Sequence, residues 1–373
     1  MLPLAGIRVL DFSTLLPGPM AGLFLVEAGA EVIKIERPGT GDEMRTYTPR
    51  LGEDSANFVL LNRGKRSIAI DLKAPDAVAQ LTPLIERTDV LIEQFRPGVM
   101  ERLGLGYAAL SKINPRLIYS SITGFGQTGP RRDMAAHDLN YLALAGLLSL
   151  TGDREGAPGM PHVPIADIAA GTYPALINVL LALLQRQRTG QGCHLDISMT
   201  DNLFVLAYWG LANGFAAGAW PTAGSALTTG ASPRYQIYRT ADGGYLSAGP
   251  IEQRFWDVFC RLIELDEALR DDAKDPVAAR AGVAACIAAY PTAHWRQVFE
   301  GQDACCAIVA NLAEAVRDPH VVARKIFDRQ ASAGAETIPA LPVPIDPALR
   351  DSVVNKSAPR LGADSGLVGS GAE

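Results

Sequence analysis

The fold is decided by a stretch that begins with the run Ile7-Arg-Val-Leu-Asp-Phe12 and ends with Glu31-Val-Ile-Lys-Ile-Glu36. Both runs are short and apolar, as expected for buried strands. Between them, Ser13–Pro19 reads as a turn, and Met20–Ala28, rich in Ala and Leu, predicts a helix. A strand, a helix and a strand in this order indicate a βαβ unit with parallel strands.

The same alternation continues along the chain and predicts an α/β fold. Further strands are expected at 67–71, 90–94, 117–123 and 193–198, with helices at 76–88 and from Asp167 to about Arg188. The predicted organisation is a large α/β domain over 1–208, a Gly- and Ala-rich linker over 209–233 and a smaller α+β domain over 234–329. The Pro-rich tail over 330–373 is expected to return to the large domain.

Composition narrows the possible classes of protein. The chain has 373 residues, is 48% hydrophobic, and carries 34 basic against 40 acidic residues, a net charge of −6. This composition suits a packed core and argues against a general nucleic-acid binder. The most apolar run, Ala175–Leu184, is shorter than a bilayer requires, so no membrane span is expected. Five scattered cysteines without a CxxC pair are typical of reduced thiols, which predicts a cytoplasmic protein.

A glycine-rich loop is predicted after the strand that ends at Thr123. Gly124-Phe-Gly-Gln-Thr-Gly129 matches the dinucleotide fingerprint, but Pro130 follows directly where that motif needs a helix. A glycine-rich active-site loop is therefore favoured over dinucleotide binding, with a simple turn as the third possibility.

Basic residues gather in the loops that follow the predicted strands. They are Arg37, the group Arg63 to Arg66 that includes Lys65, and Arg96 with Arg102. Each one alone is typical of solvated surface charge. Because ligands of parallel sheets bind beyond the carboxyl ends of the strands, the group as a whole predicts an anion site suited to a polyphosphate.

Several motifs in fixed order resemble the carnitine dehydratase and bile-acid-inducible family, also called family III CoA transferases. The resemblance rests on Val32-Ile-Lys-Ile-Glu-Arg-Pro-Gly39, Leu61-Asn-Arg-Gly-Lys-Arg-Ser67, Phe95-Arg-Pro-Gly98, Gly124-Phe-Gly-Gln-Thr-Gly-Pro130, Arg186-Gln-Arg-Thr-Gly-Gln-Gly192 and Pro359-Arg-Leu-Gly362. Each motif is weak alone, whereas their ordered combination covers nearly the whole chain.

The resemblance implies an enzyme of CoA thioesters. It implies a Rossmann-like large domain without a dinucleotide, a smaller second domain, and two subunits interlocked as a homodimer. Arg37, Lys65, Arg96 and Arg102 match positions that hold CoA in that family. Coenzyme A then enters as part of the acyl-CoA substrate, and no prosthetic group is expected.

The family has two main chemistries, and three residues distinguish them here. Ala136-His-Asp-Leu-Asn-Tyr141 is similar to the racemase motif Gly-His-Asp-x-Asn-Tyr, with Ala136 in place of the glycine. The resemblance implies that His137 and Asp167 are bases on opposite faces of an enolate and that Glu252 pairs with the histidine. In the transferases, the residue matching Asp167 is instead the nucleophile.

Each of these residues also has an ordinary structural interpretation. Asp167 could cap the helix that follows it, and Asp138 could cap a helix or accept a hydrogen bond, with the cap favoured. His137 could be a satisfied buried histidine, and Glu252 a surface acid. The remaining histidines show no spacing that predicts a metal site.

Three functions follow from the sequence. The first is a 2-methylacyl-CoA racemase or epimerase that uses His137, Asp167 and Glu252. The second is a CoA transferase that forms an adduct on Asp167. The third is a CoA-binding protein without catalytic activity.

Overall fold

The computed structural model describes residues 1–152 and 157–368, and they divide into two compact units. Unit 1 comprises 1–145, 162–206 and the chain from 320 onward. Unit 2 comprises 146–161 and 207–319. The return of the tail to unit 1 agrees with the sequence prediction.

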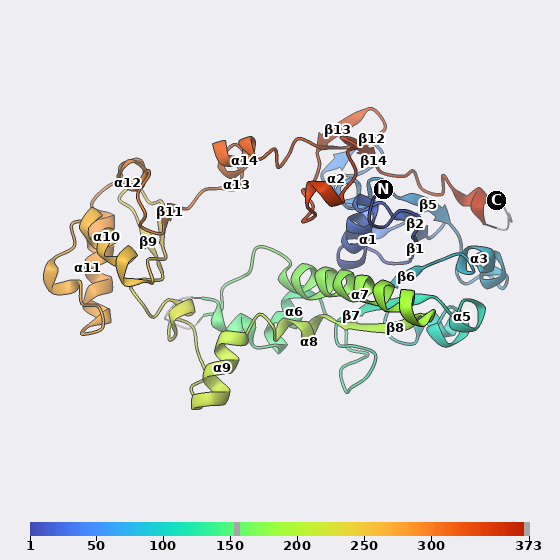
Figure 1. The fold of residues 1–373 in the computed structure, drawn as a ribbon, viewed down its shortest axis with the longest axis horizontal. Coiled ribbons are helices and arrows are strands. Elements are labelled where there is room, and N and C mark those ends of the chain that lie inside the picture. The colour runs from blue at the N-terminus through green and yellow to red at the C-terminus, as the bar shows by residue number, and fades with distance from the viewer. Residues whose placement is uncertain (153–156, 369–373) are drawn as a thin grey trace. The chain divides into compact units, whose positions relative to one another are not determined.

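A six-stranded, wholly parallel sheet forms the centre of unit 1 (Figure 1). Its spatial order is β5 (Arg66–Ala69), β2 (Glu31–Glu36), β1 (Arg8–Asp11), β6 (Val90–Glu93), β7 (Ile118–Thr123) and β8 (Cys193–Ser198). All six strands were predicted, two of them with the observed bounds. The order runs outward in both directions from the β1–β6 pair, which makes this pair the topological switch point of the sheet.

Helices cover both faces of this sheet. Leu10 and Phe12 belong to one core cluster with α3 (Ala77–Ile85) and α5 (Tyr107–Ile113). The opposite face contacts α1 (Pro17–Glu27) and α7 (Tyr173–Thr189). The remaining helices of unit 1 are α2 (Ala56–Asn62), α4 (Val99–Arg102), α6 (Asp138–Leu144) and α8 (Met199–Leu203). Strands buried on both faces explain the continuous apolar runs in the sequence.

The tail forms a small sheet of its own in unit 1. Its strands are β13 (Glu336–Pro339), β12 (Gln330–Ala333) and β14 (Asn355–Ser357), and α14 (Pro319–Ala323) precedes them. A two-stranded ribbon, β3 (Arg50–Leu51) with β4 (Asp54–Ser55), leads into α2. Asp364 then accepts the backbone N–H of Ser67 at 3.0 Å, so the chain end is bonded to the sheet edge at β5.

Unit 2 has an antiparallel sheet in the order β11 (Cys306–Ile308), β10 (Tyr245–Ala248) and β9 (Gln236–Arg239). The predicted turn at 241–244 joins the last two strands. The helices are α9 (Tyr208–Ala217), α10 (Gln253–Leu262), α11 (Pro276–Ala288), α12 (Thr292–Phe299) and α13 (Leu312–Ala315). Trp256 and Trp295 are buried in a core that α10, α11 and α12 share with the sheet.

The expected linker over 209–233 is wrong over its first part. That part belongs to α9, and the structure groups the whole segment with unit 2. Gly214 obscured the helix, because glycine disfavours helix interiors. A side chain at Gly214 would overlap the ring of Trp220, so the glycine is needed for packing. The segment 146–161 also groups with unit 2, although the predicted large domain included it.

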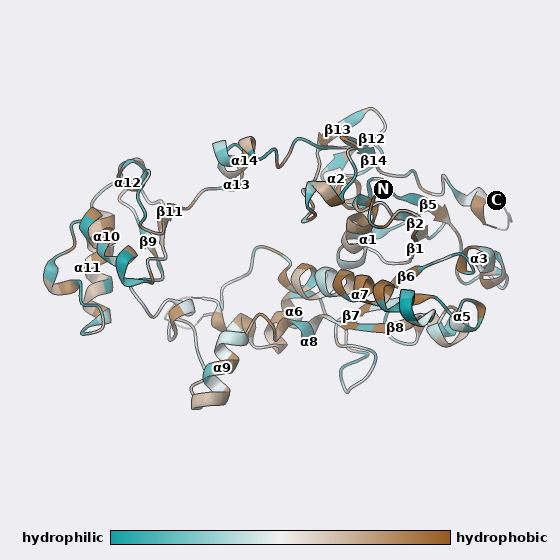
Figure 2. Ribbon diagram, viewed as in Figure 1, coloured by the Kyte–Doolittle hydropathy of each residue, from teal (hydrophilic) through white to brown (hydrophobic). Residues whose placement is uncertain are grey.

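One helical run, Ala166–Thr189, is long and apolar enough to pass a test for membrane spans, although no span was expected from the sequence. A π-helical segment, Ala166–Thr172, continues directly into α7, and the 24 residues together are long and apolar enough to cross a bilayer by length and composition. Figure 2 shows how much of α7 is hydrophobic. Its inner residues Ala175, Val179 and Ala182 are buried in unit 1, as in the core helix of a globular domain.

Candidate active site

A cavity of about 300 Å³, the catalytic cavity, lies at the switch point of the sheet. Thr14 and Leu15 line it from the loop after β1, and Gln94, Phe95 and Arg96 line it from the loop after β6. The loops after neighbouring strands diverge here because the strand order reverses, which opens a crevice at the carboxyl end of the sheet.

Asp167 lies in the first turn of the π-helical segment and lines the catalytic cavity. Its backbone N–H donates to Asp138 Oδ1 at 3.0 Å. Burial raises the pKa of Asp167 to about 6, the charge of Asp138 adds to this, and His137 opposes it. A carboxyl group with this pKa exchanges protons readily near neutral pH.

His137 lines the same cavity from a different part of the chain. It is the N-cap residue of α6, its backbone N–H donates to Asn140 Oδ1 at 3.0 Å, and its side chain is exposed. The structure therefore brings together an imidazole and a carboxyl group that lie 30 positions apart in the sequence. Asp138 does not cap its own helix α6, whose N-cap residue is His137; its carboxylate instead accepts the N–H of Asp167 in the first turn of the π-helical segment.

Tyr141 explains why the glycine-rich loop begins with Gly124. The Tyr141 ring packs so closely on this residue that a Cβ there would clash with it. The Tyr141 hydroxyl donates to the carbonyl of Ala136 at 2.8 Å. Burial raises the pKa of Tyr141 to about 12, with contributions from Asp167 and Asp138, so the phenol stays neutral. Gly124 and Phe125 line the catalytic cavity, as predicted for a loop at an active site.

A second cavity of about 210 Å³, the flanking cavity, lies at the carboxyl ends of β1, β2 and β5. Arg37 and Lys73 are among its lining residues, and Phe95 and Thr14 line both cavities. The two cavities therefore share a wall. Arg37 lines the flanking cavity and Arg96 lines the catalytic cavity, and both are exposed. An extended anionic ligand that lay across both cavities could pair with both guanidinium groups.

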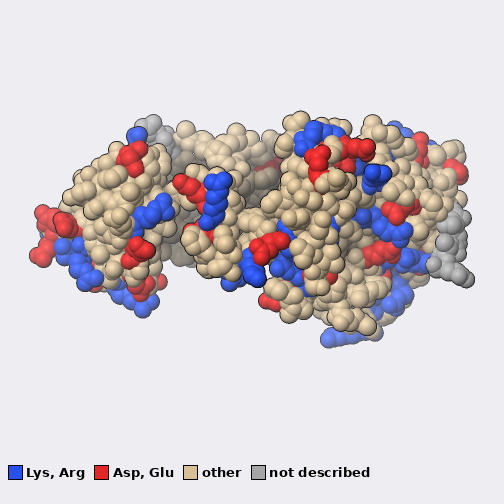
Figure 3. Space-filling view, turned by 90° about the horizontal axis from the view of Figure 1, so that it is seen from above, with Lys and Arg blue, Asp and Glu red and all other residues tan. Residues whose placement is uncertain are grey.

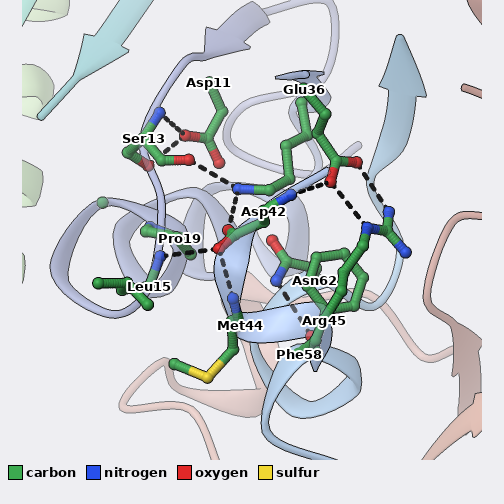
Figure 4. Close-up of polar contacts among 12 residues, drawn as sticks. Asp11, Ser13, Leu15, Pro19, Glu36, Asp42, Met44, Arg45, Phe58 and Asn62 are labelled. Atoms are coloured by element: carbon green, nitrogen blue, oxygen red, sulfur yellow. Dashed lines mark hydrogen bonds and ion pairs between the residues drawn. The ribbon is translucent and has the colours of Figure 1, made fainter. Parts of the chain in front are cut away.

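A buried charge network supports the loop between the cavities (Figure 4). Asp42 accepts the Leu15 N–H at 3.1 Å and forms an ion pair with Lys34 at 2.8 Å. Lys34 also donates to the carbonyl of Ser13 at 2.7 Å. Burial alone would lower the pKa of Lys34, but the carboxylates of Asp11, Asp42 and Glu36 together raise it. These contacts hold Leu15 at φ +63°, a conformation that costs a non-glycine residue roughly 1 kcal/mol.

The remaining predicted residues lie outside the catalytic cavity. Lys65 is fully buried, and its ammonium group bonds Asp11, Asn62 and the carbonyl of Pro19, each within 2.9 Å. It lines neither cavity, so its contact with CoA stays a prediction, and in this structure it stabilises the loop after α2. Arg102 is exposed at the end of α4. Glu252 belongs to unit 2, where it is exposed at the N-cap position of α10.

Two residues that line the catalytic cavity, Gln94 and Arg132, were not predicted from the sequence. Gln94 accepts the Gly18 N–H at 3.0 Å and so joins the loop after β6 to α1. Arg132 lines the catalytic cavity from the far end of the glycine-rich loop. Its position after Gly129 and Pro130 was the available clue. Elsewhere, Lys and Arg are interspersed with Asp and Glu on the face seen in Figure 3.

Comparisons with known proteins agree with this geometry. The family model described as CoA-transferase family III matches residues 4–365. An alpha-methylacyl-CoA racemase of Homo sapiens is 38% identical over 87% of this chain and 82% of its own. An acetyl-CoA:oxalate CoA-transferase of Acetobacter aceti is 33% identical over 92% and 89%. A solved structure of a CAIB/BAIF family protein from Brucella suis covers 98% of both chains with a TM-score of 0.84 and 28% identity.

Proposed function

The chain belongs to CoA-transferase family III, and from this premise we propose that it is a racemase or epimerase of 2-methylacyl-CoA thioesters. One observation carries the proposal: the His137 imidazole and the Asp167 carboxyl group line the same cavity at the switch point of the sheet. Two side chains that can each carry a proton, lining one cavity, are what a two-base proton transfer requires.

The proposed reaction moves one proton off the α-carbon and places another on its opposite face. The neutral imidazole of His137 removes the α-proton, and the electron pair of the C–H bond moves into the thioester to give an enolate. The protonated carboxyl group of Asp167 then delivers its proton to the other face. The products are the opposite epimer, an imidazolium and a carboxylate, and exchange with water restores the starting protonation. In the reverse direction the two residues exchange roles.

The CoA portion is proposed to lie along the shared wall of the two cavities. Arg37 and Arg96 stand at the two cavities as exposed guanidinium groups, which suits the phosphates of CoA. Arg102 and Lys65 are further ligands that the family resemblance implies. Glu252 keeps its proposed role as the partner of the histidine, which also comes from the resemblance. No prosthetic group takes part.

A CoA transferase is the second candidate, and the 33% identity to a transferase favours considering it. In that reaction the Asp167 carboxylate attacks the thioester carbonyl, the CoA thiolate leaves, and an acyl anhydride forms on the protein. The thiolate then attacks the aspartyl carbonyl, which releases the carboxylic acid and leaves a CoA thioester on Asp167. The acceptor carboxylate then attacks the aspartyl thioester and the CoA thiolate leaves. The thiolate attacks the acyl carbon of the acceptor in the new anhydride, which gives the new acyl-CoA and frees the Asp167 carboxylate. This reaction needs Asp167 but does not need His137.

A panel of acyl-CoA thioesters in deuterated water separates the two reactions. We expect the wild-type chain to place deuterium at the α-carbon of both epimers of 2-methylacyl-CoA, and His137→Ala to lose this exchange for the epimer whose α-proton His137 removes. His194→Ala is the matched control, because this exposed imidazole on β8 lies outside the cavity. CoA transfer to a free acid that survives in His137→Ala, without α-exchange in the wild type, would contradict the racemase.

A homodimer is proposed as the functional assembly. The outer face of α7 carries Ile177, Leu181 and Leu184, which are 56%, 58% and 59% exposed. They recur at helical spacing, so they form one continuous apolar stripe. A second copy of the chain would cover such a stripe.

A further inference from the structure

The segment that carries Asp167 has an unusual backbone. Residues Ala166–Thr172 are π-helical, and the Tyr173 N–H donates to the carbonyl of Ile168, five residues back. Such single turns are rare and need other contacts to hold them. Without them, the segment would relax to an α-helix continuous with α7. Removing one residue from the turn would rotate Asp167 about the helix axis by about 100° relative to α7.

The Thr172 hydroxyl connects this turn to Pro17, a residue that lines the catalytic cavity. Its fully buried hydroxyl lies 2.9 Å from the carbonyl oxygen of Pro17 and 3.2 Å from that of Asp167. The hydroxyl has one proton and donates it to one of these carbonyls at a time. Pro17 is the first residue of α1 and itself lines the catalytic cavity. When it donates to Pro17, the Thr172 hydroxyl joins the end of the π-helical turn to a residue that lines the cavity; when it donates to Asp167, it bonds the backbone of the residue that carries the carboxyl group.

A second contact comes from α8. Asn202 Nδ2 donates to the carbonyl of Ala170 at 3.0 Å, inside the π-helical turn. Between these two contacts, Gly171 is tightly packed, because a Cβ there would lie 3.1 Å from both Pro17 Cβ and Met199 Sδ and would fit only if these neighbours moved by a few tenths of an ångström. The turn is thus enclosed by α1 on one side and by α8 on the other.

We propose that Thr172 and Asn202 are positioning residues, which hold the π-helical turn so that Asp167 faces the catalytic cavity. Neither side chain lines the cavity, so both act through Asp167. The proposal rests on the proposed function, in which Asp167 handles the proton. It goes further by naming what keeps that carboxyl group in place.

Thr172→Val removes the hydroxyl and preserves the shape of the side chain, and Thr172→Ser keeps the hydroxyl. For α-proton exchange by the full chain, we expect Thr172→Val to lower kcat roughly 10- to 100-fold with KM within about twofold. Thr172→Ser is expected to recover kcat to within about threefold of wild type, and Asn202→Ala to resemble Thr172→Val. With the epimer whose α-proton the Asp167 carboxylate removes, the acid limb of the pH profile should move to lower pH in Thr172→Val, because a displaced Asp167 is better hydrated and its pKa falls.

Thr88→Val is the matched control. The Thr88 hydroxyl is equally buried and donates to a helix carbonyl, that of Leu84, at 2.7 Å, far from the site in the sequence. This variant should lose stability and keep its kcat. A kcat within twofold of wild type in Thr172→Val would overturn the proposal, and so would a Thr172→Ser variant as slow as Thr172→Val.

The test stays informative if the proposed reaction is wrong. A wild-type chain that transfers CoA without α-exchange overturns the racemase, and the same variants are then compared by transfer, which also needs Asp167. A third readout requires no turnover. In ¹³C-carboxyl NMR, the Asp167 signal is assigned by its loss in Asp167→Asn. Its titration midpoint should fall in Thr172→Val and stay near wild type in Thr172→Ser, and equal midpoints in all three proteins would overturn the proposal.

Discussion

Both candidate reactions depend on Asp167. The surroundings of its side chain disfavour the charged carboxylate form. Burial and the neighbouring Asp138 raise its pKa to about 6, whereas a free aspartate titrates near 3.8. Between these two values the folded chain holds a proton that the unfolded chain has released. A rise in pH through this window therefore destabilises the fold, and above about pH 6 the cost is constant.

This cost predicts that Asp167→Asn, which should lose epimer interconversion, is more stable than wild type. At pH 7.5 the free energy of unfolding should rise by about 1–2 kcal/mol, because the neutral amide avoids the buried charge. The gain should shrink as the pH falls toward 4. Urea denaturation at pH 5 and at pH 7.5 measures both effects. An Asn variant less stable than wild type at pH 7.5 would show that the carboxylate is well solvated or paired.

At the scale of single residues, the sequence predicted the convergence of His137 and Asp167, the proposed reacting groups, but not the contacts of the residues proposed to position them. His137 and Asp167 were expected to converge, and they line one cavity. The contacts of Thr172 and Asn202 could not be predicted, because their partners lie 155 and 32 positions away. Lys65 sits in a basic cluster typical of a surface, yet it is buried because Asp11, at the end of β1, provides a charge to pair with it.

At the scale of elements, apolar runs and terminal signals predicted the sheet well. The end of α7 is an example: the helix was expected to end at about Arg188, and Gly190 ends it at φ +70°, with its N–H bonded to the carbonyl of Arg186 at 2.8 Å. The predictions were less successful where glycine serves packing, as at Gly214 in α9. A π-helical turn likewise has no signal in a pattern read at 3.6 residues per turn.

The cap at Gly190 gives a test at this scale. Gly190→Ala should lower the free energy of unfolding by about 1 kcal/mol, since an alanine side chain disfavours a positive φ. Gly190→Asn should cost less, because asparagine tolerates the left-handed conformation. Thermal or urea unfolding measures the difference, and kcat should be unchanged in both. Equal stability of the alanine variant and the wild type would mean that the helix end relaxes freely.

At the scale of the whole molecule, the apolar stripe on α7 connects the fold to the proposed dimer. Leu181→Glu should convert a wild-type dimer to a monomer in sedimentation velocity at micromolar concentration, because it places a charge in the centre of the stripe. Val277→Glu, which changes an exposed apolar residue on α11, is the control and should leave the assembly intact. A monomeric wild-type chain, or a variant that stays dimeric, would contradict the role given to this stripe.

The site as a whole follows from the strand order. Because β1 and β6 adjoin and their following loops diverge, the chain places Thr14, Gln94, His137 and Asp167 around one crevice. The proposed CoA ligands Arg37 and Arg96 belong to loops at the same end of the sheet, since both follow strands that run in parallel. The sequence predicted this end of the sheet as the ligand site, and the two cavities lie there.

If His137 and Asp167 act on opposite faces of the α-carbon, each base removes the proton of a different epimer. The loss of one base can then be measured separately for each epimer. Each pure epimer of a 2-methylacyl-CoA is incubated in deuterated water with wild type, His137→Ala or Asp167→Asn, and α-deuterium and epimer composition are measured. We expect wild type to label and interconvert both epimers. Each variant should lose interconversion by about 10²-fold or more, with His137→Ala still exchanging only one epimer and Asp167→Asn only the other. Interconversion near the wild-type rate in either variant, or exchange of the same epimer by both, would contradict the assignment of these two residues.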